Sequence, residues 1–167
     1  DLIAGLPSDT YESFENTINE ILKLSPESVT VHSLSFKRSS ELSKKNDSEV
    51  AKTYEQVDSF VSLARTRLAE NGILPYYMYR QSKTVGNLEN VGYAKAGFEG
   101  LYNVYIMDET HTILACGASA VTKLREPCGD YIERIFNYKY PYEYINRFDD
   151  LLNRKSRIDE FYNTYKT

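Results

Sequence analysis

The chain has 167 residues, of which 41% are apolar and 26% charged, and its formal net charge is −4. This size and composition are typical of a globular protein with one substantial core, and the acidic balance without a long basic stripe argues against a nucleic-acid partner. No apolar run approaches the roughly 20 residues that span a bilayer, and nothing at the N-terminus resembles a targeting peptide, so we expect no membrane span and a cytoplasmic protein.

The first 34 residues are typical of a strand, a helix and a second strand. Residues 1–5 resemble the carboxyl end of a buried strand, and Asp9 with Glu12 three residues later predicts a capping box. A β-branched run of alternating polarity at 29–34 predicts the second strand. The crossover between the strands is long enough to require parallel pairing, which predicts a parallel sheet or barrel. The apolar residues at helical spacing are Phe14, Ile18, Ile21 and Leu22.

The middle of the chain predicts a polar connection, a long helix and a short strand. Segment 35–46 is polar and basic, which indicates an exposed connection. A helix capped at 47–48 follows and ends before Gly72, and residues 73–80 are typical of a short strand. The helix carries one continuous apolar stripe, which consists of Val50, Tyr54, Val57, Val61, Ala64 and Leu68.

Residues 81–137 give weaker signals. Residues 81–100 are rich in glycine and asparagine and lack periodicity, so they predict a structured loop that is either functional or merely connecting. Segment 101–110 fits a helix and a strand equally. Residues 112–116 predict a short buried strand that runs into a turn of small residues at 117–120, and 131–137 predict another strand.

Two amphipathic helices are predicted at the C-terminal end of the chain. The first begins at Pro141 and is indicated by apolar residues at helical spacing. The second follows a basic break at 154–155. Their apolar residues are Tyr144, Ile145, Phe148, Leu151 and Leu152 in the first, and Ile158, Phe161, Tyr162 and Tyr165 in the second.

Few residues in the chain are suited to metal binding or to acid–base chemistry. Cys116 and Cys128 match neither a zinc nor an iron–sulfur spacing, so we interpret them as buried or incidental thiols. The only histidines are His32 and His111, which excludes a multi-histidine metal site. His32 is either a general base or, as is more common for a single histidine on a strand, a structural residue.

Read in order, five segments resemble one protein family. DLIAGLPSDT at 1–10 is similar to the D-L-I-x-G-L-P-G-x-T segment of the oxygen-independent coproporphyrinogen III oxidases, and VTVHSLS at 29–35 resembles the next strand of that family. YMYRQ at 77–81, GNLENVGYA at 86–94 and ILACGASA at 113–120 are similar to its coproporphyrinogen dehydrogenase branch. The resemblance covers essentially the whole chain.

The resemblance implies a fold class between α/β and α+β. Members of this family are radical S-adenosylmethionine enzymes with a partial (β/α)6 barrel. Residues 1–48 would form the last strand–helix–strand units of that barrel, and residues 49–167 would form a C-terminal α+β domain of the coproporphyrinogen oxidase type.

The resemblance also implies a cofactor, a substrate and three binding residues. The family holds a 4Fe-4S cluster and S-adenosylmethionine, and it decarboxylates coproporphyrinogen III oxidatively to protoporphyrinogen IX in haem biosynthesis. Asp1 matches the aspartate that helps to hold S-adenosylmethionine, through the ribose, while Ile3 and Ser35 match residues that line the adenosyl group. A porphyrinogen substrate and an electron donor are the implied partners, and no catalytic residue or metal ligand is assigned on this chain.

Two family features are absent from these 167 residues. They contain neither the C-x-x-x-C-x-x-C loop that binds the cluster nor the glycine-rich segment that grips the methionyl group. We therefore expect a C-terminal portion that alone binds no cluster and no S-adenosylmethionine and is inactive. An incomplete barrel leaves an open strand edge, so we also expect self-association. The alternatives are a haem-binding or haem-transfer paralogue and a free-standing, non-catalytic binding module.

Overall fold

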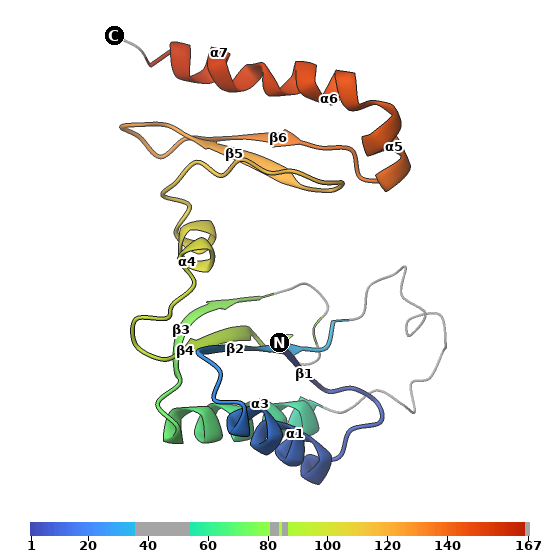
Figure 1. Ribbon diagram of the computed structural model, residues 1–167, viewed down its shortest axis with the longest axis vertical. Coiled ribbons are helices and arrows are strands. Elements are labelled where there is room, and N and C mark those ends of the chain that lie inside the picture. The colour runs from blue at the N-terminus through green and yellow to red at the C-terminus, as the bar shows by residue number, and fades with distance from the viewer. Residues whose placement is uncertain (36–53, 81–83, 85–86, 166–167) are drawn as a thin grey trace. The chain divides into compact units, whose positions relative to one another are not determined.

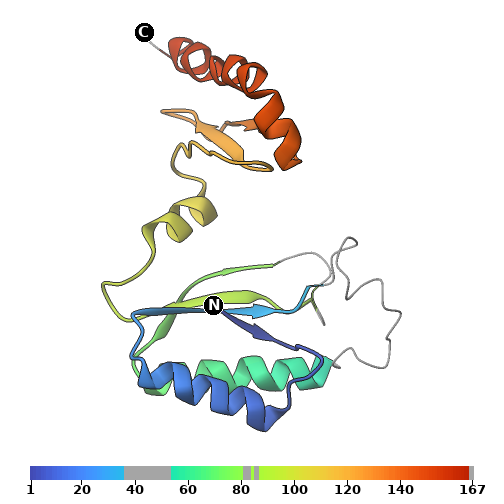
Figure 2. The same ribbon diagram turned by 45° about the vertical axis from the view of Figure 1, so that its right-hand side comes forward.

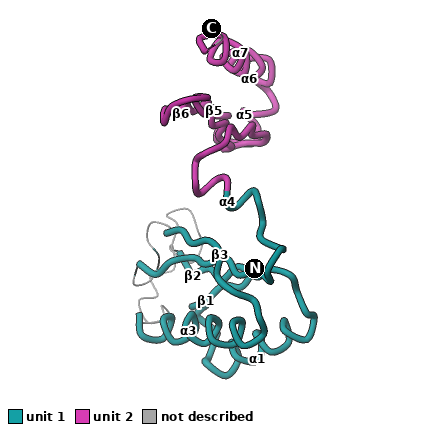
Figure 3. Tube along the Cα trace, turned by 90° about the vertical axis from the view of Figure 1, so that its left-hand side faces the viewer, with its two compact units in different colours: residues 1–104 teal, residues 105–167 magenta. Residues whose placement is uncertain are grey.

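The structure is a computed structural model that describes residues 1–35, 54–80, 84 and 87–165 (Figure 1). It is a mixed α/β protein that divides into two compact units, Asp1–Val104 and Tyr105–Thr167 (Figure 3). The predicted division between residues 48 and 49 lies outside the described residues and stays a prediction. The predicted connection at 36–46 and the predicted helix start at 47–48 lie outside them as well.

Unit 1 begins with the predicted strand–helix–strand arrangement. Strand β1 (Leu2–Ala4), helix α1 (Tyr11–Lys23) and strand β2 (Ser28–Ser33) follow one another, and β1 pairs with β2 in parallel, with Leu2 opposite Val31. Both predicted strands and their parallel pairing are therefore confirmed.

The capping box of α1 lies one residue later than predicted. Thr10, and not Asp9, is the N-cap: its Oγ1 accepts a hydrogen bond from the backbone N–H of Ser13 at 3.1 Å, and Ser13 Oγ accepts one from Thr10 N–H at 2.8 Å. Threonine caps a helix as aspartate does, because its side-chain oxygen satisfies an N–H group that has no partner within the helix. Glu12 lies inside the helix, in its first turn.

The sheet of unit 1 is mixed. Helix α3 (Tyr54–Glu70) leads into β3 (Leu74–Tyr79), and the strand order is β1-β2-β4-β3, with β4 (Asn90–Ala94) antiparallel to both of its neighbours. Within the part of the chain that the structure describes, β1–β2 is the one parallel strand pair. The partial barrel implied by the resemblance stays a prediction.

The prediction of a loop throughout 81–100 was wrong for residues 90–94. These residues form β4, which is a central strand and is buried along its whole length. Glycine and asparagine obscured the strand, and both have structural partners. Asn90 Oδ1 accepts a hydrogen bond from the backbone N–H of Ser33 at 2.8 Å, and the ring of Tyr77 covers Gly92. An aromatic ring that covers a glycine replaces the packing that the glycine cannot supply.

The core of unit 1 lies between the sheet and the two helices. Figures 1 and 2 show α1 and α3 side by side on the same face of the sheet. The predicted stripe of α3 is confirmed at Val57, Val61, Ala64 and Leu68, which are buried. It was wrong at Tyr54, which is exposed. The cluster also includes Leu2, Ala4, Phe14, Ile18, Val29, Val31, Phe60, Val61, Leu63, Ile73, Val91 and Tyr93. Neither α1 nor α3 covers the other face of the sheet.

Unit 2 is a two-stranded sheet with three short helices. Helix α4 (Leu101–Asp108), which resolves the ambiguity at 101–110, spans the boundary between the units. Strands β5 (Val121–Arg125) and β6 (Ile132–Phe136) form an antiparallel hairpin, and β6 was predicted. Leu124, Ile135 and Phe161 form its small core.

The predicted strand at 112–116 was wrong. Within this segment Ile113 alone makes a bridge, to Lys123, and Leu114 and Cys116 are exposed. The strand is β5, a few residues later, where Thr122 is buried and its Oγ1 accepts a hydrogen bond from Ala115 N–H at 3.0 Å. Cys128 is exposed too, so of the two predicted alternatives, buried or incidental thiols, burial was wrong.

The predictions for the turn and for the helices that flank this hairpin were more accurate. Gly117 and Ser119 have positive φ angles of 100° and 64°, as a turn of small residues requires. The region of the two predicted C-terminal helices contains three helices, which are α5 (Pro141–Asn146), α6 (Phe148–Lys155) and α7 (Arg157–Asn163). The breaks fall at Arg147 and Ser156. In the part of the chain that the structure describes, no helix has the length and apolar character needed to cross a membrane.

Candidate functional site on the open face of the sheet

Asp1 and Ile3 project from the face of the sheet that α1 and α3 leave uncovered. Successive side chains of a strand point to opposite faces, and Leu2 and Ala4 are buried against the helices. The Asp1 side chain is 73% exposed and Ile3 is 44% exposed. Two of the three residues predicted to bind the cofactor therefore share one accessible face.

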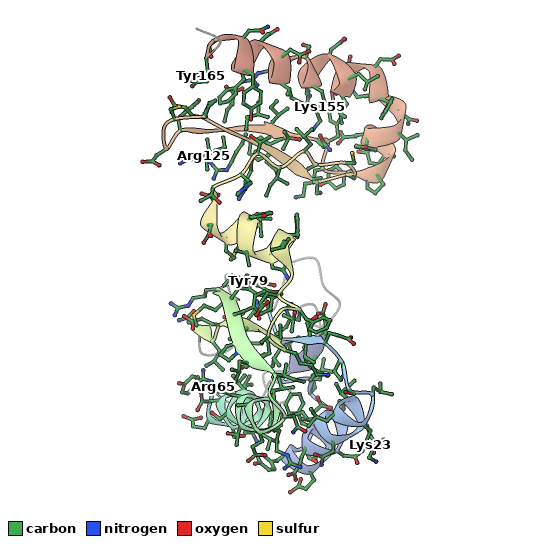
Figure 4. All side chains as sticks on the ribbon, turned by 60° about the vertical axis from the view of Figure 1, so that its left-hand side comes forward. Lys23, Arg65, Tyr79, Arg125, Lys155 and Tyr165 are labelled. Atoms are coloured by element: carbon green, nitrogen blue, oxygen red, sulfur yellow. The ribbon has the colours of Figure 1, made fainter. Side chains whose placement is uncertain are left out.

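His32 connects Asp1 to the far edge of the sheet. It pairs with Ile3 in the parallel register and lies on the same open face. Its Nε2 atom is 3.6 Å from Asp1 Oδ2, and its Nδ1 atom is 3.3 Å from the hydroxyl oxygen of Tyr79 on β3. Figure 4 shows Tyr79 on the side of the sheet away from the helices that carry Arg65 and Lys23. A polar row thus crosses the sheet from Asp1 through His32 to Tyr79.

One tautomer of neutral His32 satisfies both neighbours. An ionised carboxylate only accepts hydrogen bonds, so the tautomer with its proton on Nε2 suits the Asp1 carboxylate 3.6 Å away and leaves Nδ1 to accept a hydrogen bond from the hydroxyl of Tyr79. The second nitrogen of the ring fixes the tautomer of the first, so Tyr79 orients His32 toward the carboxylate. His32 therefore has polar neighbours on both sides. Its predicted role, as a general base or as a structural residue, stays a prediction.

Tyr77 lies beside this row and is held flat on the sheet. A Cβ atom on Gly92 would lie only 1.8 Å from Cε1 of Tyr77, so the ring occupies the space of the missing side chain. The hydroxyl of Tyr77 is 3.4 Å from Thr30 Oγ1, and the rings of Tyr77 and Tyr79 are parallel within 3°. The open face therefore presents two aligned tyrosine rings next to the His32 and Asp1 pair.

Burial lowers the pKa of His32 below its ordinary value of 6.5. The carboxylate of Asp1 acts in the opposite direction, but it is largely exposed and solvent screens it. The unfolded chain therefore binds the proton more readily than the folded chain does. Stability is greatest when His32 is neutral, at pH above 6.5, and falls as the pH drops from 6.5 through the lowered pKa.

The direction of this pKa shift predicts a measurable difference between the natural chain and a variant that lacks His32. We expect the free energy of unfolding to fall more steeply for the natural chain than for His32→Gln as the pH is lowered below 6.5, measured by urea unfolding at several pH values. His111→Gln, at an exposed histidine of unit 2, should keep the slope of the natural chain. A proton NMR titration that puts the pKa of His32 above 6.5 would contradict the argument.

Ser35, the third predicted residue, lies just beyond the end of β2. It is half-buried and forms an isolated antiparallel bridge with Thr84. The sequence argument did not find Tyr77, Tyr79 and Gly92. Tyrosines two residues apart on a predicted strand were an available signal, because such residues share a face. Their partners became evident only once β4 was known to lie between β2 and β3.

The described residues fit the implied cofactors unequally. A largely exposed carboxylate on an open face, as at Asp1, is suited to accept hydrogen bonds from the hydroxyl groups of a ribose. A 4Fe-4S cluster requires several cysteine thiolates. Within 1–35, 54–80, 84 and 87–165, no group of three or more histidine, cysteine, aspartate or glutamate side chains is arranged to hold a metal, so these residues do not fit a cluster.

Comparison with known proteins supports the resemblance. The chain is 40% identical over 160 residues to the oxygen-independent coproporphyrinogen-III oxidase-like protein HemZ of Bacillus subtilis (strain 168). The alignment covers 96% of this chain and 32% of that protein, so the chain spans about a third of the length of the curated relative that it matches. No family model matches the chain, and no solved structure matches it. The resemblance stated from the sequence is thereby confirmed.

Proposed function

We propose that this chain is the C-terminal portion of a radical S-adenosylmethionine enzyme that decarboxylates coproporphyrinogen III to protoporphyrinogen IX without oxygen. The observation that carries the proposal is the 40% identity to an oxidase-like protein over nearly the whole chain. The parallel β1–β2 pair with its helical crossover is compatible with the last strands of the barrel. The exposed carboxylate of Asp1 on the open face supports the proposal of a cofactor site there.

In this proposal Asp1 accepts hydrogen bonds from the ribose of S-adenosylmethionine, and Ile3 and Ser35 line the adenosyl group. When bound, S-adenosylmethionine would supply the radical chemistry for oxidative decarboxylation of a propionate side chain of the substrate. His32 Nε2 lies 3.6 Å from the Asp1 carboxylate, and the Tyr79 hydroxyl contacts the other nitrogen of the His32 ring. The cluster ligands would come from other parts of the enzyme, because the described residues do not fit a cluster.

A haem-binding or haem-transfer role is the second candidate. It is favoured by one observation, which is that the relative is named oxidase-like and not oxidase. A binding role would use the same open face without radical chemistry. The two candidates make opposite predictions for turnover of the porphyrinogen.

The test is an anaerobic turnover assay of the full-length enzyme with a reconstituted cluster, S-adenosylmethionine, a reductant and coproporphyrinogen III. We expect conversion of the four-carboxylate tetrapyrrole to the two-carboxylate product. Substrate and product are oxidised to the fluorescent porphyrins and then measured by chromatography with fluorescence detection. Tight haem binding without decarboxylation would support the second candidate instead. As a control, the 167-residue chain treated with iron and sulfide should develop no 4Fe-4S absorption. Formation of that spectrum would contradict the proposed division of labour.

A further inference from the structure

Three arginines of unit 2 converge on one side of its C-terminal helices. Arg147 is the N-cap of α6, Arg154 lies in its last turn, and Arg157 is the first residue of α7. Separations of seven and three residues place them along one stripe. They line an open pocket of about 430 Å³ together with Tyr138, Asp150 and Asn153.

Tyr138 fixes two of the guanidinium groups in this pocket. Its side chain is almost fully buried, and the guanidinium carbons of Arg147 and Arg154 lie 4.5 Å and 4.2 Å from the centre of its ring. Cations at this distance from an aromatic face are attracted to it. Asp150 Oδ2 accepts hydrogen bonds from the Tyr138 hydroxyl at 3.3 Å and from Arg147 Nη2 at 2.8 Å. The arrangement is therefore ordered before any ligand binds.

The positive charge of the pocket is only partly compensated. Arg147 is paired with Asp150, and Arg157 is paired with Glu133 on β6. Arg154 donates to a neutral acceptor, the carbonyl oxygen of Phe136, at 3.3 Å. Among the described residues no carboxylate oxygen lies within 4.0 Å of its guanidinium nitrogens.

An anion would complete this set of charges. Like charges three to four residues apart on a helix repel each other, so Arg154 and Arg157 disfavour one another without an acid between them. The planar fork of a guanidinium matches the two oxygens of a carboxylate, and most of the N–H donors of Arg154 remain available for it. The Asn153 amide lies in the same pocket lining and is a further donor.

We propose that Arg154, with Arg147 and Arg157 beside it, binds a propionate carboxylate of the tetrapyrrole substrate. The identity of the ligand rests on the proposed function, whereas the preference for a carboxylate rests on the charges and geometry of the pocket. The site belongs to unit 2 and is separate from the residues that the cofactor would contact. It gives the three arginines a role in recognising the substituents of the macrocycle.

The test measures binding of coproporphyrin III to the 167-residue chain by fluorescence anisotropy. Coproporphyrin III is the oxidised, fluorescent counterpart of the proposed substrate and carries the same four propionates. We expect Arg154→Gln to raise Kd about tenfold or more, in line with hydrogen bonds to charged groups, and Arg154→Lys to recover part of the loss. Arg134→Gln removes the same charge outside the pocket and should change Kd by less than about twofold.

Two further arms identify the ligand group. A coproporphyrin whose carboxylates are converted to amides should bind as weakly to the natural chain as coproporphyrin III binds to Arg154→Gln. Excess S-adenosylmethionine, which also carries a carboxylate, should not displace the porphyrin. Equal binding of the amide, displacement by S-adenosylmethionine, or an unchanged Kd in Arg154→Gln would overturn the inference. Circular dichroism establishes that each variant is folded. Decarboxylation by the full-length enzyme is measured separately, so a failure of this site is distinguishable from a failure of the proposed function.

Discussion

Replacing Asp1 by asparagine in the full-length enzyme is expected to weaken S-adenosylmethionine binding about 10- to 100-fold. In the proposed cofactor site the carboxylate would offer two acceptor oxygens to the ribose hydroxyls, whereas the amide replaces one acceptor with a donor. Hydrogen bonds to charged groups contribute roughly 1.5–3 kcal/mol, which corresponds to this range of Kd. Equilibrium dialysis with labelled S-adenosylmethionine measures the change directly.

The exposure of Asp1 makes this experiment easy to interpret. Its side chain is 73% exposed and contacts His32 at 3.6 Å, so the substitution should leave the fold intact. Asp149→Asn, at an exposed position of α6, removes the same charge from unit 2 and should leave the Kd unchanged. A Kd for Asp1→Asn within twofold of the natural value would remove Asp1 from the proposed cofactor site, whatever the enzyme does to porphyrinogens.

Replacing Leu68 by alanine is expected to lower the free energy of unfolding of unit 1 by about 2–5 kcal/mol. Leu68 is completely buried in the cluster between α1, α3 and the sheet. The substitution removes apolar surface from that cluster and leaves a cavity whose walls close only in part. Urea unfolding, monitored by hydrogen exchange of the β2 and β4 amides, measures the decrease in the free energy of unfolding within unit 1.

Leu24→Ala is the matched control for this substitution. It makes the same chemical change at the C-cap of α1, where Leu24 is 76% exposed, and it should change the stability by no more than about 0.5 kcal/mol. Equal effects of the two substitutions would contradict the core described for unit 1.

The sequence predicted the elements whose periodicity is set by one buried face. Helix α3 was recognisable because Val57, Ala64 and Leu68 follow the helical repeat and are buried. The parallel pairing of β1 and β2 followed from the length of the crossover between them. Elements buried on both faces or rich in small residues were missed, since β4 contains Gly92 and depends on a ring from another strand to cover it. Tertiary packing, which local sequence does not encode, decided that strand.

The candidate site was predictable only in part. Asp1 and Ile3 were identified through their resemblance to a family motif, and the alternation of β1 then places them on one face. The link from Asp1 through His32 to Tyr79 joins three strands, and its last step depends on β3 lying across β4 from β2. No spacing in the sequence contains that information.

The late position of β4 in the chain has a consequence for biosynthesis. On the ribosome, β1, α1, β2, α3 and β3 all emerge before Asn90, yet β2 and β3 are joined in the sheet only by the strand that begins there. Until Ala94 has left the ribosome, β2 and β3 each have an unpaired edge that can bind a neighbouring nascent chain. A nascent chain whose emerged part ends before Asn90 is therefore an aggregation-prone intermediate, and emergence of the five residues of β4 joins β2 to β3.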